Sequence, residues 1–290
     1  MTGVLWAAAS GIGFGLFQSL NARAVREVED VYLSTLLQLL VAALVLVGVC
    51  LATEDLGQLA DAPGWALASF AIAGVLHFLV GWTLLNLSQD RIGAARTSPL
   101  LIMVPIFGVV IAAVTLGELP RAAALAAIAP MVLGAWVVSA PGSGPVARWQ
   151  DSLFGLGTAF MWALSPVFTV KGLEGLDSPV LGVAIGLLVS VAGCGLALAI
   201  TRPRRRRLQR RGMALKLAAG VLVALATWGR WESLDLVTVG VVLALNLLSV
   251  PVVLLLAPVV SGRHVEHVTV RVWVGAGLVV GGSLALIVLE

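Results

Sequence analysis

The stretch from Val31 to Leu51 reads VYLSTLLQLLVAALVLVGVCL, 21 residues without a charged side chain. As a helix it matches the hydrocarbon core of a bilayer, which takes about 20 apolar residues to cross. Similar runs recur along the chain, of whose 290 residues 60% are hydrophobic and 11% charged. No single aqueous core hides that much apolar surface, so the composition predicts an integral membrane protein rather than a soluble enzyme.

Windows of about 19 residues predict ten membrane spans. They are Val4 to Leu20, Val31 to Leu51, Trp65 to Leu87, Ala95 to Leu116, Ala122 to Ala140, Leu153 to Val170, Val180 to Ile200, Met213 to Trp231, Val237 to Val259 and Val268 to Leu289. Because a helix satisfies every backbone donor and acceptor within its own segment, we expect an all-α membrane protein of ten transmembrane helices.

The stretch Pro141-Gly142-Ser143-Gly144-Pro145 separates five predicted spans from five more. Trp82 and Trp228 each lie 23 residues before a proline, Pro105 and Pro251 respectively. These matches predict an internal duplication, with residues 1–146 and 147–290 as two five-helix repeats. Since five is odd, the second repeat enters the membrane from the opposite side, giving inverted repeats, a frequent plan of transporters.

Basic residues predict the orientation in the plasma membrane. All but three of the 18 Lys and Arg residues lie in odd-numbered loops or at their helix ends, a set in which Arg96 and Lys216 are counted. The exceptions are Arg121, Lys171 and Arg230. The positive-inside rule therefore places odd loops in the cytoplasm and both chain ends outside. The basic stretch from Arg202 to Arg211 is predicted to contact anionic lipid rather than nucleic acid.

Motifs of one known family follow Asn86. They are Gly93-Ala94-Ala95-Arg96-Thr97-Ser98-Pro99-Leu100, Pro105 and Gly117-Glu118, with a fainter copy from Asn246 to Pro251 in which Gly262-Arg263-His264 replaces the Gly-Glu. With these residues, and with ten spans and a duplication over nearly its whole length, the chain resembles the EamA-like family of the drug/metabolite transporter superfamily. The resemblance implies two inverted five-helix repeats, a central cavity and movement of small metabolites without ATP hydrolysis. Members usually keep both ends in the cytoplasm, whereas the charges here favour the reverse.

Three ionisable residues within spans are the first candidates for solute binding or proton coupling, because buried charges are costly and tend to face cavities or partners. His77 is near the middle of the third span, and either relays a proton or simply bonds to a neighbouring helix. Arg230 and Glu232 lie near the end of the eighth span. For these two, binding or coupling competes with contact at the lipid headgroups.

Aromatic and amide side chains form the second group of candidates. Four tryptophans either stack on a solute or lie at the membrane interface: Trp6, Trp82, Trp162 and Trp228. Five amides either bind solute or, as we favour, bond helices to one another: Gln18, Asn21, Gln38, Asn86 and Asn246.

The stretch His264-Val265-Glu266-His267 places two imidazoles and a carboxylate together, but its spacing is not that of a zinc protease motif. We expect a solvated loop there, and predict neither a metal nor a cofactor. Cys50 and Cys194 lie far apart within apolar runs and are expected to be packing residues.

These features favour a secondary transporter that moves a small metabolite or drug-like solute by alternating access, in the direction of export. One alternative is a lipid-handling or scaffolding protein without saturable transport. Another is an intramembrane enzyme, for which no convergent set of catalytic residues is evident. The expected partners are a small solute and membrane lipids, and self-association into a homo-oligomer stays open.

Overall fold

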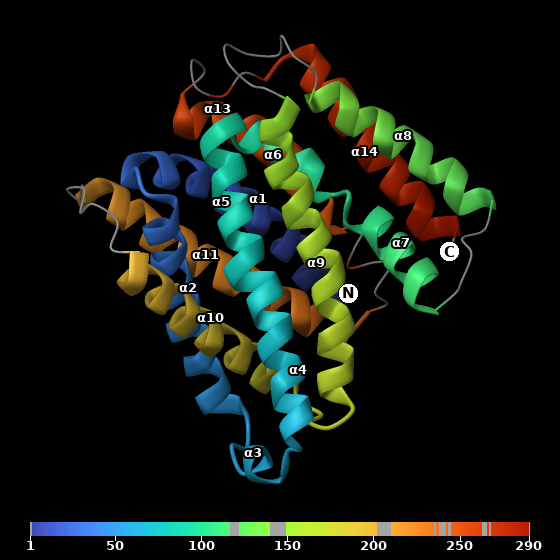
Figure 1. Cartoon of the computed structure of the whole chain (residues 1–290). Coiled ribbons are helices and arrows are strands. Elements are labelled where there is room, and N and C mark those ends of the chain that lie inside the picture. Colours follow the sequence, from blue (N-terminus) through green and yellow to red (C-terminus); the bar gives the residue numbers. More distant parts are fainter. Residues whose placement is uncertain are drawn as a thin grey trace.

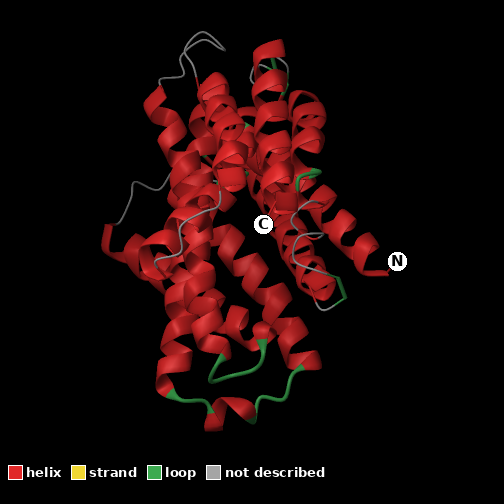
Figure 2. Cartoon of the chain, turned by 90° about the vertical axis from the view of Figure 1, so that its right-hand side faces the viewer, coloured by secondary structure: helices red, strands yellow, loops and turns green. Residues whose placement is uncertain are grey.

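The computed structural model describes residues 2–116, 122–139, 149–201, 210–234, 236, 237, 242, 245–262, 266 and 268–289. Within these ranges every regular element is helical (Figure 2). In chain order they are α1 (Thr2–Val28), α2 (Val31–Thr53), α3 (Gln58–Asp61), α4 (Gly64–Gly74), η1 (Val75–Val80), α5 (Gly81–Ile92), α6 (Ala94–Leu101), α7 (Val104–Leu116), α8 (Ala122–Ser139), η2 (Trp149–Asp151), α9 (Ser152–Leu173), α10 (Pro179–Thr201), α11 (Arg210–Leu234), α13 (Ser249–Ser261) and α14 (Val270–Leu289).

Among the described residues, six helical segments are long and apolar enough to cross a membrane. They are Thr2–Val28, Val31–Thr53, Gly64–Ile92, Trp149–Leu173, Pro179–Thr201 and Arg210–Arg230. Four shorter apolar helices complete the set: Ala94–Gly108, Ala126–Val138, Ser249–Ser261 and Val270–Ala285. The prediction of an all-helical, multi-pass membrane protein is thereby confirmed, whereas the inverted repeat of ten helices stays a prediction.

The fourth predicted span is a broken helix. It consists of α6 and α7, which are separated by a turn at Ile102 and Met103. Pro99 lies inside α6, and Pro105 is in the first turn of α7, where its missing N–H costs no hydrogen bond. The two prolines therefore explain why this helix ends and begins again within one apolar run.

The third predicted span contains one irregular segment, the π-helix η1, between α4 and α5. His77 lies within it. Short π-helical turns inside longer helices widen the backbone by one residue and occur frequently at functional sites. This local geometry makes η1 a part of the bundle where a polar side chain is expected to have a role beyond packing.

The two halves of the chain are interleaved rather than side by side (Figure 1). Helix α1 packs on α11 and α13, α2 on α10 and α11, and α4 with α5 on α9. Helices α8 and α14 pack on each other, and both also contact α6. Any residue in the interior of the bundle therefore has neighbours from both halves.

The backbones of α4 and α10 approach closely where Gly74 faces Gly186. A methyl group at Gly74 would lie 2.1 Å from the Cα atom of Gly186. We expect Gly74→Ala to destabilise the protein by about 1–3 kcal/mol, because the two helices must move apart. Thermal unfolding in detergent measures the effect.

Gly48, in α2, is the matched control, because nothing lies within 4 Å of a methyl group added there. Gly48→Ala should leave the midpoint unchanged or raise it, since alanine favours helix by up to about 1 kcal/mol over glycine. Equal effects of the two substitutions would contradict the close packing of α4 on α10.

Candidate solute-binding site

Lys216 lies in the interior of the bundle, on α11, and its side chain has no exposed surface. Its Nζ atom donates hydrogen bonds to the side-chain oxygens of three amides. The acceptors are Asn21 Oδ1, Gln38 Oε1 at 2.8 Å and Asn86 Oδ1 at 3.2 Å. Helices α1, α2 and α5 of the first half thus hold a cation of the second half. Within the described chain no carboxylate bonds to this lysine.

The amides around Lys216 also bond to one another. Asn21 Nδ2 donates to Asn86 Oδ1 at 2.8 Å and to Gln89 Oε1 at 2.6 Å. Asn86 Nδ2 donates to Thr35 Oγ1 at 2.9 Å. The side chains of Asn21, Gln38, Asn86, Gln89 and Lys216 are hereafter called the Lys216 cluster, and all five are fully buried.

Two donors of the Lys216 cluster are left without a partner. The Nε2 atoms of Gln38 and Gln89 are enclosed and make no hydrogen bond to any described residue. An unsatisfied buried amide group costs about 1–3 kcal/mol. The cluster therefore has two unpaired N–H donor groups beside a buried positive charge. This combination is expected of a binding site rather than of a purely structural network.

The prediction that Lys216 is a loop or helix-end residue is wrong. The side chain points into the protein because the apolar helix around it packs on α1 and α2, and its hydrogen-bond partners among the described residues are amides of those helices and of α5. Arg96, counted in the same set, is also buried, at 7% exposure. The sequence did contain an indication of burial, because Lys216 lies inside the predicted span from Met213 to Trp231.

The prediction that Glu266 lies in a solvated loop is wrong. Its side chain is almost fully buried, because it accepts hydrogen bonds from the backbone N–H groups of Ala94 at 3.0 Å and Ala95 at 3.2 Å. These are free donors in the first turn of α6, where a carboxylate is favoured. Its Oε1 atom also pairs with Arg26 of α1 at 3.0 Å. This set of contacts is called the Glu266 cap; His264 and His267 lie outside the described residues.

Gly93 explains part of the motif that follows Asn86. Its φ of 81° is one that residues with a side chain rarely adopt, and a Cβ atom there would lie 2.5 Å from Glu266 Oε2. Arg26 Nη2 donates to the backbone oxygen of Gln89 at 3.2 Å, just before this glycine. Gln89 therefore connects the Glu266 cap, through its backbone, with the Lys216 cluster, through its side chain.

His77 contacts residues that do not belong to the Lys216 cluster. Its Nδ1 atom is 3.1 Å from Ser165 Oγ of α9, and its ring stacks on Trp162 with 5.4 Å between centroids. Trp162 Nε1 also donates to the His77 carbonyl at 3.2 Å. Two predicted candidates, His77 and Trp162, from two segments of the chain are therefore in contact. Arg230 lies on α11, where its backbone oxygen accepts a hydrogen bond from Ser233 Oγ at 2.6 Å.

Glu232 accepts a hydrogen bond from Trp228 Nε1 at 2.9 Å, one helical turn earlier on α11. Trp228 contacts Trp6 of α1, with 5.9 Å between ring centroids. Trp82 instead is buried and packs edge to face on Phe78 at 5.1 Å. The structure thus pairs Glu232 with Trp228 and places Trp82 in the apolar interior.

Asn246 keeps both side-chain polar atoms enclosed and without a partner among the described residues. It lies beside Gly11 of α1, where an added methyl group would be 3.1 Å from the Asn246 Cα atom. Of the predicted amides, Asn86 therefore belongs to the Lys216 cluster, whereas Asn246 stands apart from it as a second buried group with unused hydrogen bonds.

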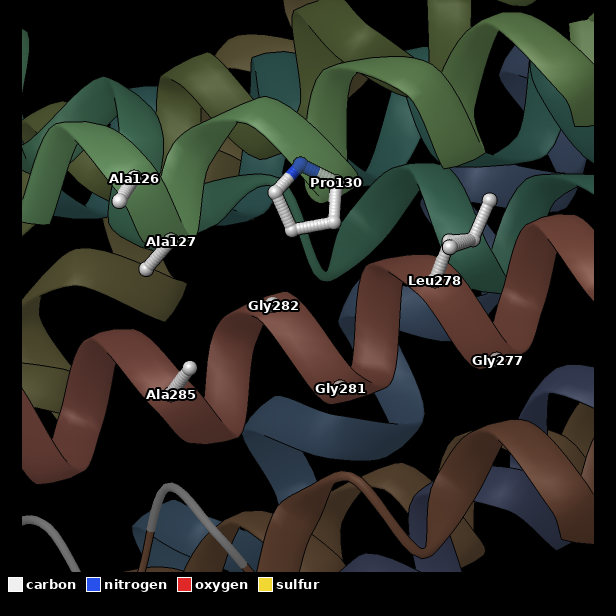
Figure 3. Close-up of a pocket in the computed structure, with 8 residues that line it drawn as sticks. All are labelled: Ala126, Ala127, Pro130, Gly277, Leu278, Gly281, Gly282 and Ala285. Atoms are coloured by element: carbon white, nitrogen blue, oxygen red, sulfur yellow. The ribbon is translucent and has the colours of Figure 1, made fainter.

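A concave surface of about 330 Å³ lies between α8 and α14 (Figure 3). Its lining consists of Ala126, Ala127, Pro130, Gly277, Leu278, Gly281, Gly282 and Ala285. No side chain of this lining carries a charge or a hydrogen-bonding group, so the groove lacks the means to select a polar solute. Among the described residues, no three His, Cys, Asp or Glu side chains are grouped to hold a metal ion.

Comparison with known proteins gives a family match for the first half of the chain. The model of the EamA-like transporter family matches residues 1–140. These residues are an EamA-like transporter family domain. A crystal structure is similar over 98% of this chain and 99% of its own, with a TM-score of 0.62 and 20% sequence identity, which shows the fold alone. No curated protein matches.

The EamA-like domain supplies all the amides of the Lys216 cluster, on α1, α2 and α5. Lys216 itself lies beyond the matched residues, as does Glu266. The most buried ionisable groups of the candidate site therefore come from the second half and fit onto the family domain of the first. The basic stretch predicted to contact lipid lies outside the described residues from position 202 to position 209.

Proposed function

We propose that this protein is a secondary transporter, not an enzyme, that moves a small metabolite or drug-like solute across the plasma membrane by alternating access. The direction proposed is export, driven by a gradient. The observation that carries the proposal is the fully buried Lys216, bonded by amides of three helices in a membrane bundle. Ionisable groups at such positions mark solute or proton pathways in transporters.

Stability alone does not account for a lysine at this position. Removing an ammonium from water costs several kcal/mol, and neutral amides compensate for that cost less well than a carboxylate does. Apolar side chains of similar volume fill such a site at equal or lower cost. The presence of Lys216 at this position is therefore better explained by a solute or proton that it contacts during transport.

The helix contacts support an architecture of inverted repeats. If the second half repeats the first, the pairing of α1 with α11 has its equivalent in the pairing of α4 and α5 with α9, and both are present. The pairing of α2 with α11 likewise corresponds to that of α10 with α4. In the proposed architecture an axis between the halves relates each pair to its equivalent, as in transporters whose halves move around a central site.

The proposed orientation keeps odd loops in the cytoplasm. Without the buried Arg96 and Lys216, 13 basic residues (15 − 2) remain on that side against the three exceptions. The Glu266 cap, formed where α1 and α5 end, then lies on the cytoplasmic side. His77 and Glu232 are proposed as coupling groups together with Lys216, and Trp162 and Trp228 as residues that contact the solute.

The first test is thermal unfolding of the detergent-purified protein against amino acids, nucleosides, sugars, polyamines and cationic dyes. We expect one class to raise the midpoint saturably, since a ligand at 100 times its Kd stabilises by about 2.7 kcal/mol. The same class should have a smaller effect on Glu232→Gln or His77→Ala. A flat response to the whole panel would instead favour a lipid-handling or scaffolding protein.

A further inference from the structure

We propose that the Lys216 cluster binds a carboxylate group of the transported solute. The inference rests on the transport function proposed above and adds the chemical class of its substrate. It follows from the charge, the hydrogen-bond donors and the burial of five side chains: Asn21, Gln38, Asn86, Gln89 and Lys216.

The charge of the cluster is uncompensated. Lys216 bonds only to neutral amide oxygens, and in the described part of the chain its hydrogen-bond partners include no carboxylate. By contrast, Arg23 pairs with Glu27 at 2.9 Å, Arg26 with Glu266 at 3.0 Å and Arg91 with Asp151 at 3.3 Å. Lys216 thus differs from these cations in lacking an internal anion, although it is the most deeply buried. A single negative charge on a bound solute would compensate the Lys216 ammonium.

The amide orientations follow from Lys216. An ammonium only donates hydrogen bonds, so Asn21, Gln38 and Asn86 must turn their oxygens toward it. Asn21 Nδ2 then donates to the oxygen of Gln89. The Nε2 atoms of Gln38 and Gln89 remain as donors without acceptors. Rotating either amide would remove an existing hydrogen bond, so the excess of donors is a property of the cluster.

A carboxylate fits this excess because it is an acceptor only, with two oxygens that offer about four acceptor positions. It would compensate the ammonium and offer acceptors to the unpaired Nε2 donors of the cluster. A sugar hydroxyl or a neutral amide supplies no charge, and a cation would meet repulsion. On α1, Gln18 Oε1, one turn before Asn21, is a further buried acceptor without a partner among the described residues.

The test compares carboxylates with neutral amides of the same shape. Benzoate and pyruvate are titrated into the purified protein beside benzamide and pyruvamide, with sodium chloride at equal ionic strength, and unfolding midpoints are recorded. We expect the carboxylates to bind roughly 10- to 100-fold more tightly than the amides, the usual effect of charge-assisted hydrogen bonds. An equal response to chloride would identify a general anion site and overturn the assignment to a carboxylate.

Gln38→Glu places an internal carboxylate beside Lys216 without a change in shape. It should raise the unfolding midpoint and abolish the response to benzoate, because the anion is already supplied. Gln58→Glu, on the exposed α3, is the control and should keep the parent response. A benzoate response retained in Gln38→Glu would overturn the proposal.

Measurements in reconstituted vesicles distinguish a failure of the carboxylate site from a failure of the transport function. Saturable transport of a solute without a carboxylate, together with no carboxylate binding, would overturn this inference and leave the transport function standing. Carboxylate binding that is lost in Gln38→Glu, without movement of any bound carboxylate across the vesicle membrane, would support the site and contradict the transport function.

Discussion

Replacement of Lys216 by methionine is expected to lower solute transport by roughly 10- to 100-fold, the effect of losing a charged hydrogen-bond donor to a solute. The helix bundle should stay folded, because methionine is unbranched and of similar length, and because removing a lone buried charge relieves its desolvation cost. Initial rates in reconstituted vesicles and unfolding midpoints in detergent measure the two effects independently.

Lys171→Met is the matched control, since Lys171 is the other lysine of the chain. It is exposed and pairs with Glu174, three residues later and directly after the end of α9. Its loss should alter neither transport nor stability, because exposed pairs contribute about 0–1 kcal/mol. Normal transport by Lys216→Met would contradict the central role given to Lys216, and unfolding of that variant would indicate a structural role.

The second large effect is expected for Glu266→Ala, which should destabilise the protein by about 3–5 kcal/mol. The substitution leaves Arg26 without its buried partner and frees the N–H groups of Ala94 and Ala95 at the start of α6. Glu174→Ala, which breaks an exposed pair, is the control and should have little effect. Equal shifts of the two midpoints would contradict the assignment of the Glu266 cap.

The same substitution should also expose Lys216. The Glu266 cap joins the segment between α13 and α14 to α1 and α6, so its loss frees one end of the bundle, near the Lys216 cluster. In a Lys171→Arg background, the only side-chain amine is that of Lys216. A small amine-reactive reagent should therefore label Lys216 in Glu266→Ala faster than in the parent, and unchanged labelling would show that the cap does not control access.

Much of the fold is readable from the sequence. Runs such as Val31 to Leu51 predict spans because about 20 apolar residues match the bilayer, and helix α2 has nearly the same bounds. The resemblance after Asn86 is confirmed by the family match over residues 1–140. Breaks within spans were not predicted, because hydropathy averages over a window and does not detect a turn at Ile102 or a π-helix at His77.

The candidate site was predicted only in part. Asn86, Asn21 and Gln38 were singled out as amides that bond between helices, and the structure joins all three to one cluster. Lys216 was assigned to a helix end because it lies close to the basic stretch, and Glu266 to a loop because its neighbours are polar. Both assignments used proximity along the chain, whereas burial depends on which helix packs across the residue.

The sequence by itself determined that this protein lies in a membrane as a set of apolar helices, because the hydrophobic effect acts on each segment alone and is written in its composition. Only the tertiary structure decided which polar side chains meet. Asn21, Gln38, Asn86 and Lys216 come from four helices up to 195 positions apart. Their hydrogen bonds act over about 3 Å, so nothing short of helix packing brings a lysine of the second half onto the amides of the first.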